Sequence, residues 1–145
     1  MSLASLLSHW RSSPEVSSNI VEWRTIPPRA AQFDPFPDDL EPALANSLRA
    51  QGIEALYSHQ SEAWRLLRDG RDLVVQTGTA SGKTLCYNLP VLNRLIRDND
   101  ACALYLFPTK ALAQDQLSKL KALMDNAEYP SLQNTLLFSI YDGDT

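Results

Sequence analysis

The stretch from Asp72 to Thr84 constrains the fold of this 145-residue sequence more than any other part of it. It reads Asp-Leu-Val-Val-Gln-Thr-Gly-Thr-Ala-Ser-Gly-Lys-Thr, and an apolar segment with helical spacing follows it. The apolar run 73–75 predicts a buried parallel strand, so the order is strand, loop of small residues, helix. Backbone N–H groups in such a loop can close around phosphate oxygens, because small side chains do not block their approach. The helix N-terminus that follows also favours negative charge.

This loop is therefore a candidate phosphate-binding loop. Its strict pattern has glycine where this chain has Thr77, so the prediction depends on the strand before it and the helix after it. Lys83 would reach the β- and γ-phosphates, and the Thr84 hydroxyl would hold Mg²⁺. The alternative is an ordinary turn. The candidate phosphate-binding residues are Thr77, Gly78, Thr79, Ala80, Ser81, Gly82, Lys83 and Thr84.

Length and composition fit one globular domain at most, with 44% apolar residues. The net charge of −4 gives no basic footprint, although a local groove for nucleic acid is not excluded. Cys86 and Cys102 have no metal-like spacing, and we interpret both as buried, reduced thiols of a cytoplasmic protein. We expect no signal peptide and no membrane span.

The region before the loop divides into an arm and two helices. Apolar spacing predicts a short helix over 3–10, and six of the nine prolines then lie between positions 12 and 42. Within that arm, 19–26 could form an extended strand. The arm either lies across a core or is a loose tail. A helix over 38–51, capped by Asp38 or Asp39, should end at Gly52.

A second helix should run from Ser58 to Gly70, directly before the phosphate-loop strand. Gln60 would lie in its first turn, where an amide can pair with a donor and an acceptor on an adenine edge. Tyr57 could stack on the adenine ring. The alternative is a surface glutamine and a core tyrosine.

The rest of the chain completes a βαβαβ order, which implies a parallel sheet with right-handed crossovers. A helix over 85–97 contains Pro90, and a helix follows with an apolar face from Ala113 to Met124. Continuous apolar runs predict strands over 101–107 and 135–141. Three polar loops then share the carboxyl edge of the sheet, where ligands bind in such folds; they are 77–84, 108–110 and 142–145.

Four motifs in this order resemble those of superfamily 2 helicases of the DEAD/DEAH type. They are Tyr57-Ser58-His59-Gln60, Thr77 to Thr84, Phe107-Pro108-Thr109-Lys110-Ala111-Leu112 with Gln114 and Gln116, and Tyr141-Asp142-Gly143-Asp144-Thr145. The sequences of these motifs look most like those of the RecQ-related DNA-repair branch that carries a C-terminal four-cysteine metal-binding domain, the mitomycin repair type. The resemblance covers 56–145.

The resemblance implies a fold, cofactors and partners. The fold would be α/β, an incomplete RecA-like P-loop NTPase sheet with flanking helices behind an N-terminal helical and extended arm. Positions 1–52 would be that arm with its helix, and 53–145 the N-terminal part of the first RecA-like domain. Gln60 and Tyr57 would bind the adenine of ATP, with Mg²⁺ at the phosphates. Thr109, Lys110, Asp144 and Thr145 would contact a DNA strand without reading its sequence.

The chain departs from the family because it has no Asp-Glu-x-His or Asp-Glu-x-Asp segment. That motif supplies the Mg²⁺-binding carboxylate and the base that orients water. The sequence therefore resembles the N-terminal piece of a DNA helicase, with Lys83 as its catalytic residue and the remaining helicase domains as partners. We expect an exposed sheet edge and no turnover from this chain alone. The alternatives are an RNA helicase fragment, a small-molecule kinase and a non-catalytic remnant.

Overall fold

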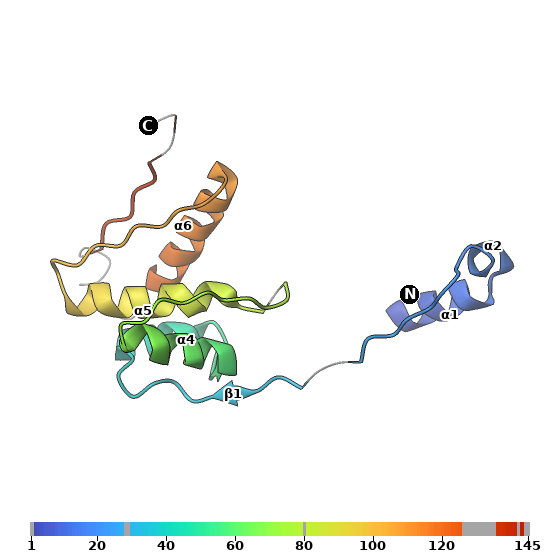
Figure 1. Cartoon of the computed structure of the whole chain (residues 1–145), viewed down its shortest axis with the longest axis horizontal. Coiled ribbons are helices and arrows are strands. Elements are labelled where there is room, and N and C mark those ends of the chain that lie inside the picture. The colour runs from blue at the N-terminus through green and yellow to red at the C-terminus, as the bar shows by residue number, and fades with distance from the viewer. Residues whose placement is uncertain (1, 28–29, 80, 126–135, 142, 144–145) are drawn as a thin grey trace. The chain divides into compact units, whose positions relative to one another are not determined.

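The computed structural model of the chain describes residues 2–27, 30–79, 81–125, 136–141 and 143. The chain divides into two compact units, Met1–Ala30 and Ala31–Thr145. The first unit holds helices α1 (Leu3–Ser12) and α2 (Pro14–Ser17), which Figure 1 shows. The short N-terminal helix is confirmed, but none of its residues is buried. The strand that we expected over 19–26 is absent from the described residues of this unit.

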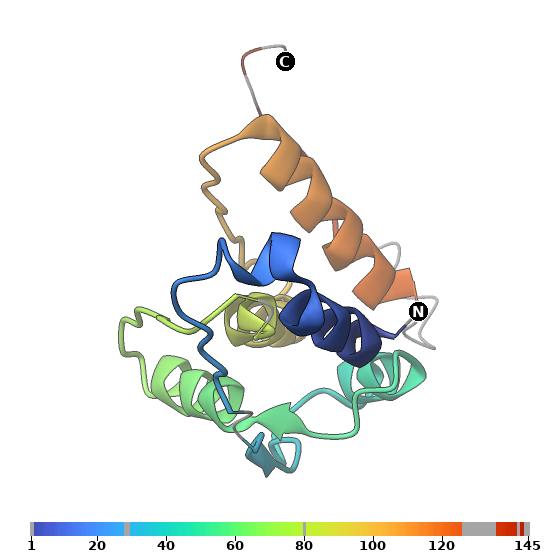
Figure 2. The same ribbon diagram turned by 90° about the vertical axis from the view of Figure 1, so that its right-hand side faces the viewer.

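The second unit is mostly helical. Figures 1 and 2 show α6 inclined to α5, which follows the predicted phosphate loop. A small antiparallel sheet pairs Phe33 with Tyr57 and Asp34 with Leu56. The elements of the second unit are, in chain order, β1 (Phe33–Asp34), α3 (Pro42–Ala50), β2 (Leu56–Tyr57), α4 (Ser58–Arg68), α5 (Lys83–Arg97) and α6 (Lys110–Asp125).

The core of this unit is made where helices α3, α4, α5 and α6 meet, and α4 contributes Trp64 to it. It contains leucines from α3, α5 and α6, among them Leu44, Leu48, Leu89, Leu92, Leu120 and Leu123. We had placed α3 with the N-terminal arm, but its apolar face packs into this core. The helix also begins later than Asp38 and Asp39, because Pro42 lacks an N–H and suits the first helical position. Asp39 instead accepts a hydrogen bond from Trp64 Nε1 at 3.1 Å.

The predicted parallel sheet is not formed in the part of the chain that the structure describes. None of the segments 73–75, 101–107 and 136–141 is assigned as a strand, and residue 135 lies outside the described ranges. A strand needs hydrogen bonds from a neighbour, and these three segments do not pair with one another. The continuous apolar runs identified chain segments that suit a sheet, but they could not show which partners each segment has.

Alternation along two of these segments still fits a sheet surface. In 136–141, Leu136 and Phe138 pack against the core while Leu137 is 96% exposed. In 101–107, Tyr105 packs against the core while Leu104 and Leu106 are exposed. A period of two is what an extended strand imposes on its side chains. One face of each segment therefore contacts the helices, and the other face is apolar and uncovered.

Candidate functional site

The predicted phosphate loop connects 73–75 to the start of α5. Gly82 is the N-cap of α5 and has φ of 72°, in the left-handed region that favours glycine. Lys83 and Thr84 are the first two residues of α5. The loop thus ends at a helix N-terminus, where free backbone N–H groups favour an anion. Ala80 lies outside the described residues.

The ammonium group of Lys83 is turned into this loop. Its Nζ donates to the Thr77 carbonyl at 3.2 Å and to the Gly78 carbonyl, and it lies 3.3 Å from the hydroxyls of Thr77 and Ser81. Those two hydroxyls also share a hydrogen bond. The loop therefore supplies the lysine with acceptors of its own, at the place where phosphate oxygens are expected.

Gln60 connects the start of α4 to this loop. Its Nε2 donates to the Gly82 carbonyl at 2.8 Å, and its Oε1 accepts from the Tyr57 N–H at 2.9 Å. The side chain is only 4% exposed. A Cβ at position 82 would lie 2.6 Å from Gln60 Nε2, so a larger residue there would displace the end of the Gln60 side chain, in addition to the unfavourable φ. Both ends of the amide that we assigned to adenine thus bond to the chain's own backbone.

Three rings stack beside this connection, and the sequence indicated only one of them. Phe33 stacks on Tyr57 with ring centres 4.9 Å apart, and Tyr57 stacks on His59 at 5.6 Å. His59 Nε2 also hydrogen-bonds the Ser81 carbonyl at 2.9 Å. Phe33 was missed because its place depends on the register between β1 and β2. The sequence signal that could have identified His59 as a site residue was its position next to Gln60 in the same motif.

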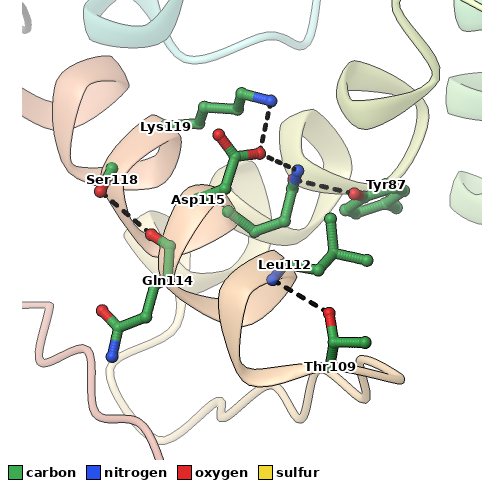
Figure 3. Close-up of polar contacts among 8 residues, drawn as sticks. Tyr87, Thr109, Leu112, Gln114, Asp115, Ser118 and Lys119 are labelled. Carbon is green, nitrogen blue, oxygen red and sulfur yellow. Dashed lines mark hydrogen bonds and ion pairs between the residues drawn. The ribbon is translucent and has the colours of Figure 1, made fainter.

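Two of the four predicted nucleic-acid residues, Thr109 and Lys110, lie where 101–107 leads into α6. Thr109 Oγ1 accepts the N–H of Leu112 at 3.3 Å, as Figure 3 shows, and Lys110 is the first residue of the helix. Thr109 therefore caps α6 at its N-terminus, and both residues are exposed. Asp144 and Thr145 lie outside the described residues.

A polar contact links the two helices that begin at these loops. Tyr87 of α5 donates its hydroxyl to Gln116 Oε1 of α6 at 3.0 Å. Gln116 Nε2 donates to Asp115, which also accepts from Lys119 at 2.7 Å (Figure 3). Tyr105 lies edge-on to Tyr87, and burial raises the pKa of Tyr105 to about 12.

The two cysteines differ. Cys86 is buried in α5, and burial raises the pKa of its thiol, so the thiol stays protonated at neutral pH. Cys102, which we expected to be buried, is exposed because it lies on the uncovered side of its segment. The described ranges contain no cluster of three or more His, Cys, Asp or Glu residues that could hold a metal ion. None of their helices has the length and apolar character that a membrane crossing requires.

Comparison with known proteins identifies the family. The family model described as DEAD/DEAH box helicase matches residues 57–144. The uncharacterized ATP-dependent helicase YprA of Bacillus subtilis (strain 168) is 43% identical over 144 residues, which are 99% of this chain and 18% of the relative. The ATP-dependent helicase hrq1 of Schizosaccharomyces pombe is 38% identical over 148 residues, 99% of this chain and 14% of the relative.

A solved structure agrees with these sequence relatives. The crystal structure of the DUF1998 helicase MrfA bound to DNA matches with a TM-score of 0.85 and 42% identity, covering 100% of this chain and 18% of that one. The chain thus spans less than a fifth of the relatives that it matches. The match includes all four motifs up to residue 144, together with the loop and the Gln60 connection. On this evidence the chain belongs to the DEAD/DEAH box helicase family.

Proposed function

We propose that this chain is the ATP-binding part of a DNA helicase motor, in which nucleotide binding is linked to contact with one DNA strand. The observation that supports this most is the position of Lys83, whose ammonium lies inside a loop that ends at a helix N-terminus. The names of the relatives agree with the proposal, since they are ATP-dependent helicases and one structure is bound to DNA.

The residues of the loop suit a triphosphate. Phosphate oxygens would replace the carbonyls of Thr77 and Gly78 as partners of Lys83, because a bond between two charged groups is the stronger one. Backbone N–H groups of 78–84 would bind the same phosphates. Bound Mg²⁺ would offset charge that develops on the phosphates, and the Thr84 hydroxyl would be its ligand from this chain.

The adenine would lie beside the stacked rings of Phe33, Tyr57 and His59. Gln60 has one N–H and one lone pair beyond its two backbone bonds, so its amide can bind the adenine edge without leaving them. An adenine on Tyr57 or Phe33 would extend the stack, and both rings are partly exposed. A nucleotide at this place would contact both the α4 start and the loop.

The DNA strand would contact Thr109 and Lys110 at the start of α6, with Asp144 and Thr145 nearby. Such contacts grip the backbone of a strand, and only contacts to a 2′-hydroxyl would favour RNA. Competition between single-stranded DNA and RNA of the same sequence decides between the two. We further propose a DNA-repair role in the cytoplasm for the complete protein.

The complete domain would also contain the parallel sheet that the sequence predicts. We propose that 53–145 is the N-terminal part of a RecA-like domain, and that 73–75, 101–107 and 135–141 are parallel strands in its sheet. The alternation of exposed and packed side chains at Leu104, Tyr105 and Leu106 supports this, because it is the pattern that a strand in a layered fold shows.

Replacing Lys83 tests the proposal directly. Lys83→Ala removes charge-assisted hydrogen bonds worth roughly 1.5–3 kcal/mol each, so affinity for ATP should fall at least about tenfold. Titration calorimetry with Mg-ATP measures the change. Lys121→Ala is the matched control, since it removes the same charge from an exposed position on α6. Equal affinities for the Lys83→Ala variant and the unchanged chain would mean that the loop is only a turn.

A further inference from the structure

Tyr87 and Gln116 form a polar contact in a largely apolar part of the second unit. Gln116 is 5% exposed, and the leucines at 89, 92 and 120 on the same two helices belong to the core. Burying the amide of Gln116 is unfavourable unless it is hydrogen-bonded, and the partly buried Tyr87 hydroxyl supplies one partner. The two groups lie 3.0 Å apart, so each fixes the position of the other. Asp115 accepts from the amide nitrogen of Gln116 and holds its orientation.

The contact lies close to both functional loops. Tyr87 is four residues after Lys83, so both side chains lie on one face of α5, roughly 6 Å apart along the helix axis. Gln116 is seven residues after Thr109, about two turns and roughly 10 Å along α6. A shift of α5 that follows a change at the loop would therefore move the N-terminus of α6 through this bond.

The other end of α6 is fixed in a different way. Ser47 of α3 donates its hydroxyl to the carbonyl of Leu123, in a buried hydrogen bond. That bond holds the C-terminal part of α6 to α3, which does not lead to the phosphate loop. The two bonds thus offer a comparison, since each fixes α6 through one hydroxyl and only one of them involves α5.

We infer that Tyr87 and Gln116 are positioning residues that transmit nucleotide binding at 77–84 to the nucleic-acid contacts at the start of α6. The inference rests on the proposed function, because it requires both ligands to bind. As positioning residues, Tyr87 and Gln116 would act through their hydrogen bond and not by contacting ATP or DNA. Their bond makes the position of Thr109 and Lys110 depend on the position of Lys83, so the affinity for one ligand depends on the presence of the other.

The experiment measures this dependence on the 145-residue chain. The affinity for a fluorescent ATP analogue is determined with and without saturating oligo-deoxythymidine, and the ratio of the two is the coupling factor. We expect a factor on the order of ten in the unchanged chain. Tyr87→Phe keeps the ring against Tyr105 and removes only the hydroxyl, so the factor should fall to about one while the affinity for each ligand alone is kept.

The control is Ser47→Ala, which removes the buried bond between Ser47 and Leu123 of α6 and should leave the coupling factor unchanged. The double variant Tyr87→Phe with Gln116→Leu removes both polar groups, leaves none unpaired, and should match Tyr87→Phe. Linkage adds a check, since oligo-deoxythymidine affinity with and without the analogue must give the same factor.

The outcomes separate the two proposals. A chain that binds neither ligand would contradict the proposed function. A chain that binds both with a coupling factor of one, or variants that keep the factor of the unchanged chain, would contradict this inference alone. An equal fall in Ser47→Ala would also overturn it, because general loosening of α6 would then explain the effect.

Discussion

At the scale of single residues, Gly82 and Gln60 define the geometry of the candidate site. Gly82 has φ of 72°, and its carbonyl accepts the Gln60 amide at 2.8 Å. The sequence indicated that both residues belong to a nucleotide site, because their motifs are local. It could not indicate that they contact each other, since that contact brings together residues 22 positions apart.

Replacing Gly82 by alanine tests this contact. The left-handed conformation costs an alanine roughly 1–2 kcal/mol, and displacing Gln60 would lose two further hydrogen bonds worth about 1 kcal/mol each. We expect Gly82→Ala to lower the free energy of unfolding by roughly 3–4 kcal/mol and to weaken ATP binding. Urea unfolding and titration calorimetry measure the two effects.

Gly70 provides a control for the backbone alone. It has the same φ of 72°, but a Cβ there would meet nothing within 4 Å. Gly70→Ala should therefore show only the conformational cost, roughly 1–2 kcal/mol, and should keep the affinity for ATP. If the two glycine variants behave alike, crowding against Gln60 has no importance.

At the scale of elements, the longer helices were predictable, whereas the four-residue α2 and the sheet were not. Helix spacing is a local property, and the stops at Gly52 and Gly70 have the positive φ values of 78° and 72° that their residue type suggested. Strands depend on partners distant in sequence, so the apolar run 101–107 identified a segment without its neighbours. The β1–β2 pair was missed because each of these strands has only two residues, which leave no periodicity to detect in the sequence.

Two leucine-to-alanine substitutions test whether the apolar face of the segment 101–107 is uncovered. Leu92 of α5 is 0% exposed, whereas Leu104, in the apolar run 101–107, is 86% exposed. Leu92→Ala should lower the free energy of unfolding by about 2–5 kcal/mol, and Leu104→Ala by less than about 0.5 kcal/mol. Chemical denaturation compares them. A large loss at Leu104 would show that this face is covered in solution.

At the scale of the whole molecule, the chain has a compact unit that carries every predicted site residue and a separate N-terminal unit. The site unit has Lys83, but the sequence has no Asp-Glu-x-His segment to hold Mg²⁺ and orient water. We therefore expect ATP binding without turnover. Release of phosphate should stay at the level of the Lys83→Ala variant, with or without oligo-deoxythymidine, and any rate above that level would contradict the expectation.

The carbonyls that hold Lys83 have a consequence for how a bound product would leave. If ATP binds as proposed, dissociation of the nucleotide would not leave the Lys83 ammonium without hydrogen-bond partners. The carbonyls of Thr77 and Gly78 would accept hydrogen bonds from it again. These hydrogen bonds would stabilise the empty site and so lower the free energy that nucleotide dissociation requires. In the proposed motor, a lysine with two sets of partners would therefore let the site empty more readily in each cycle.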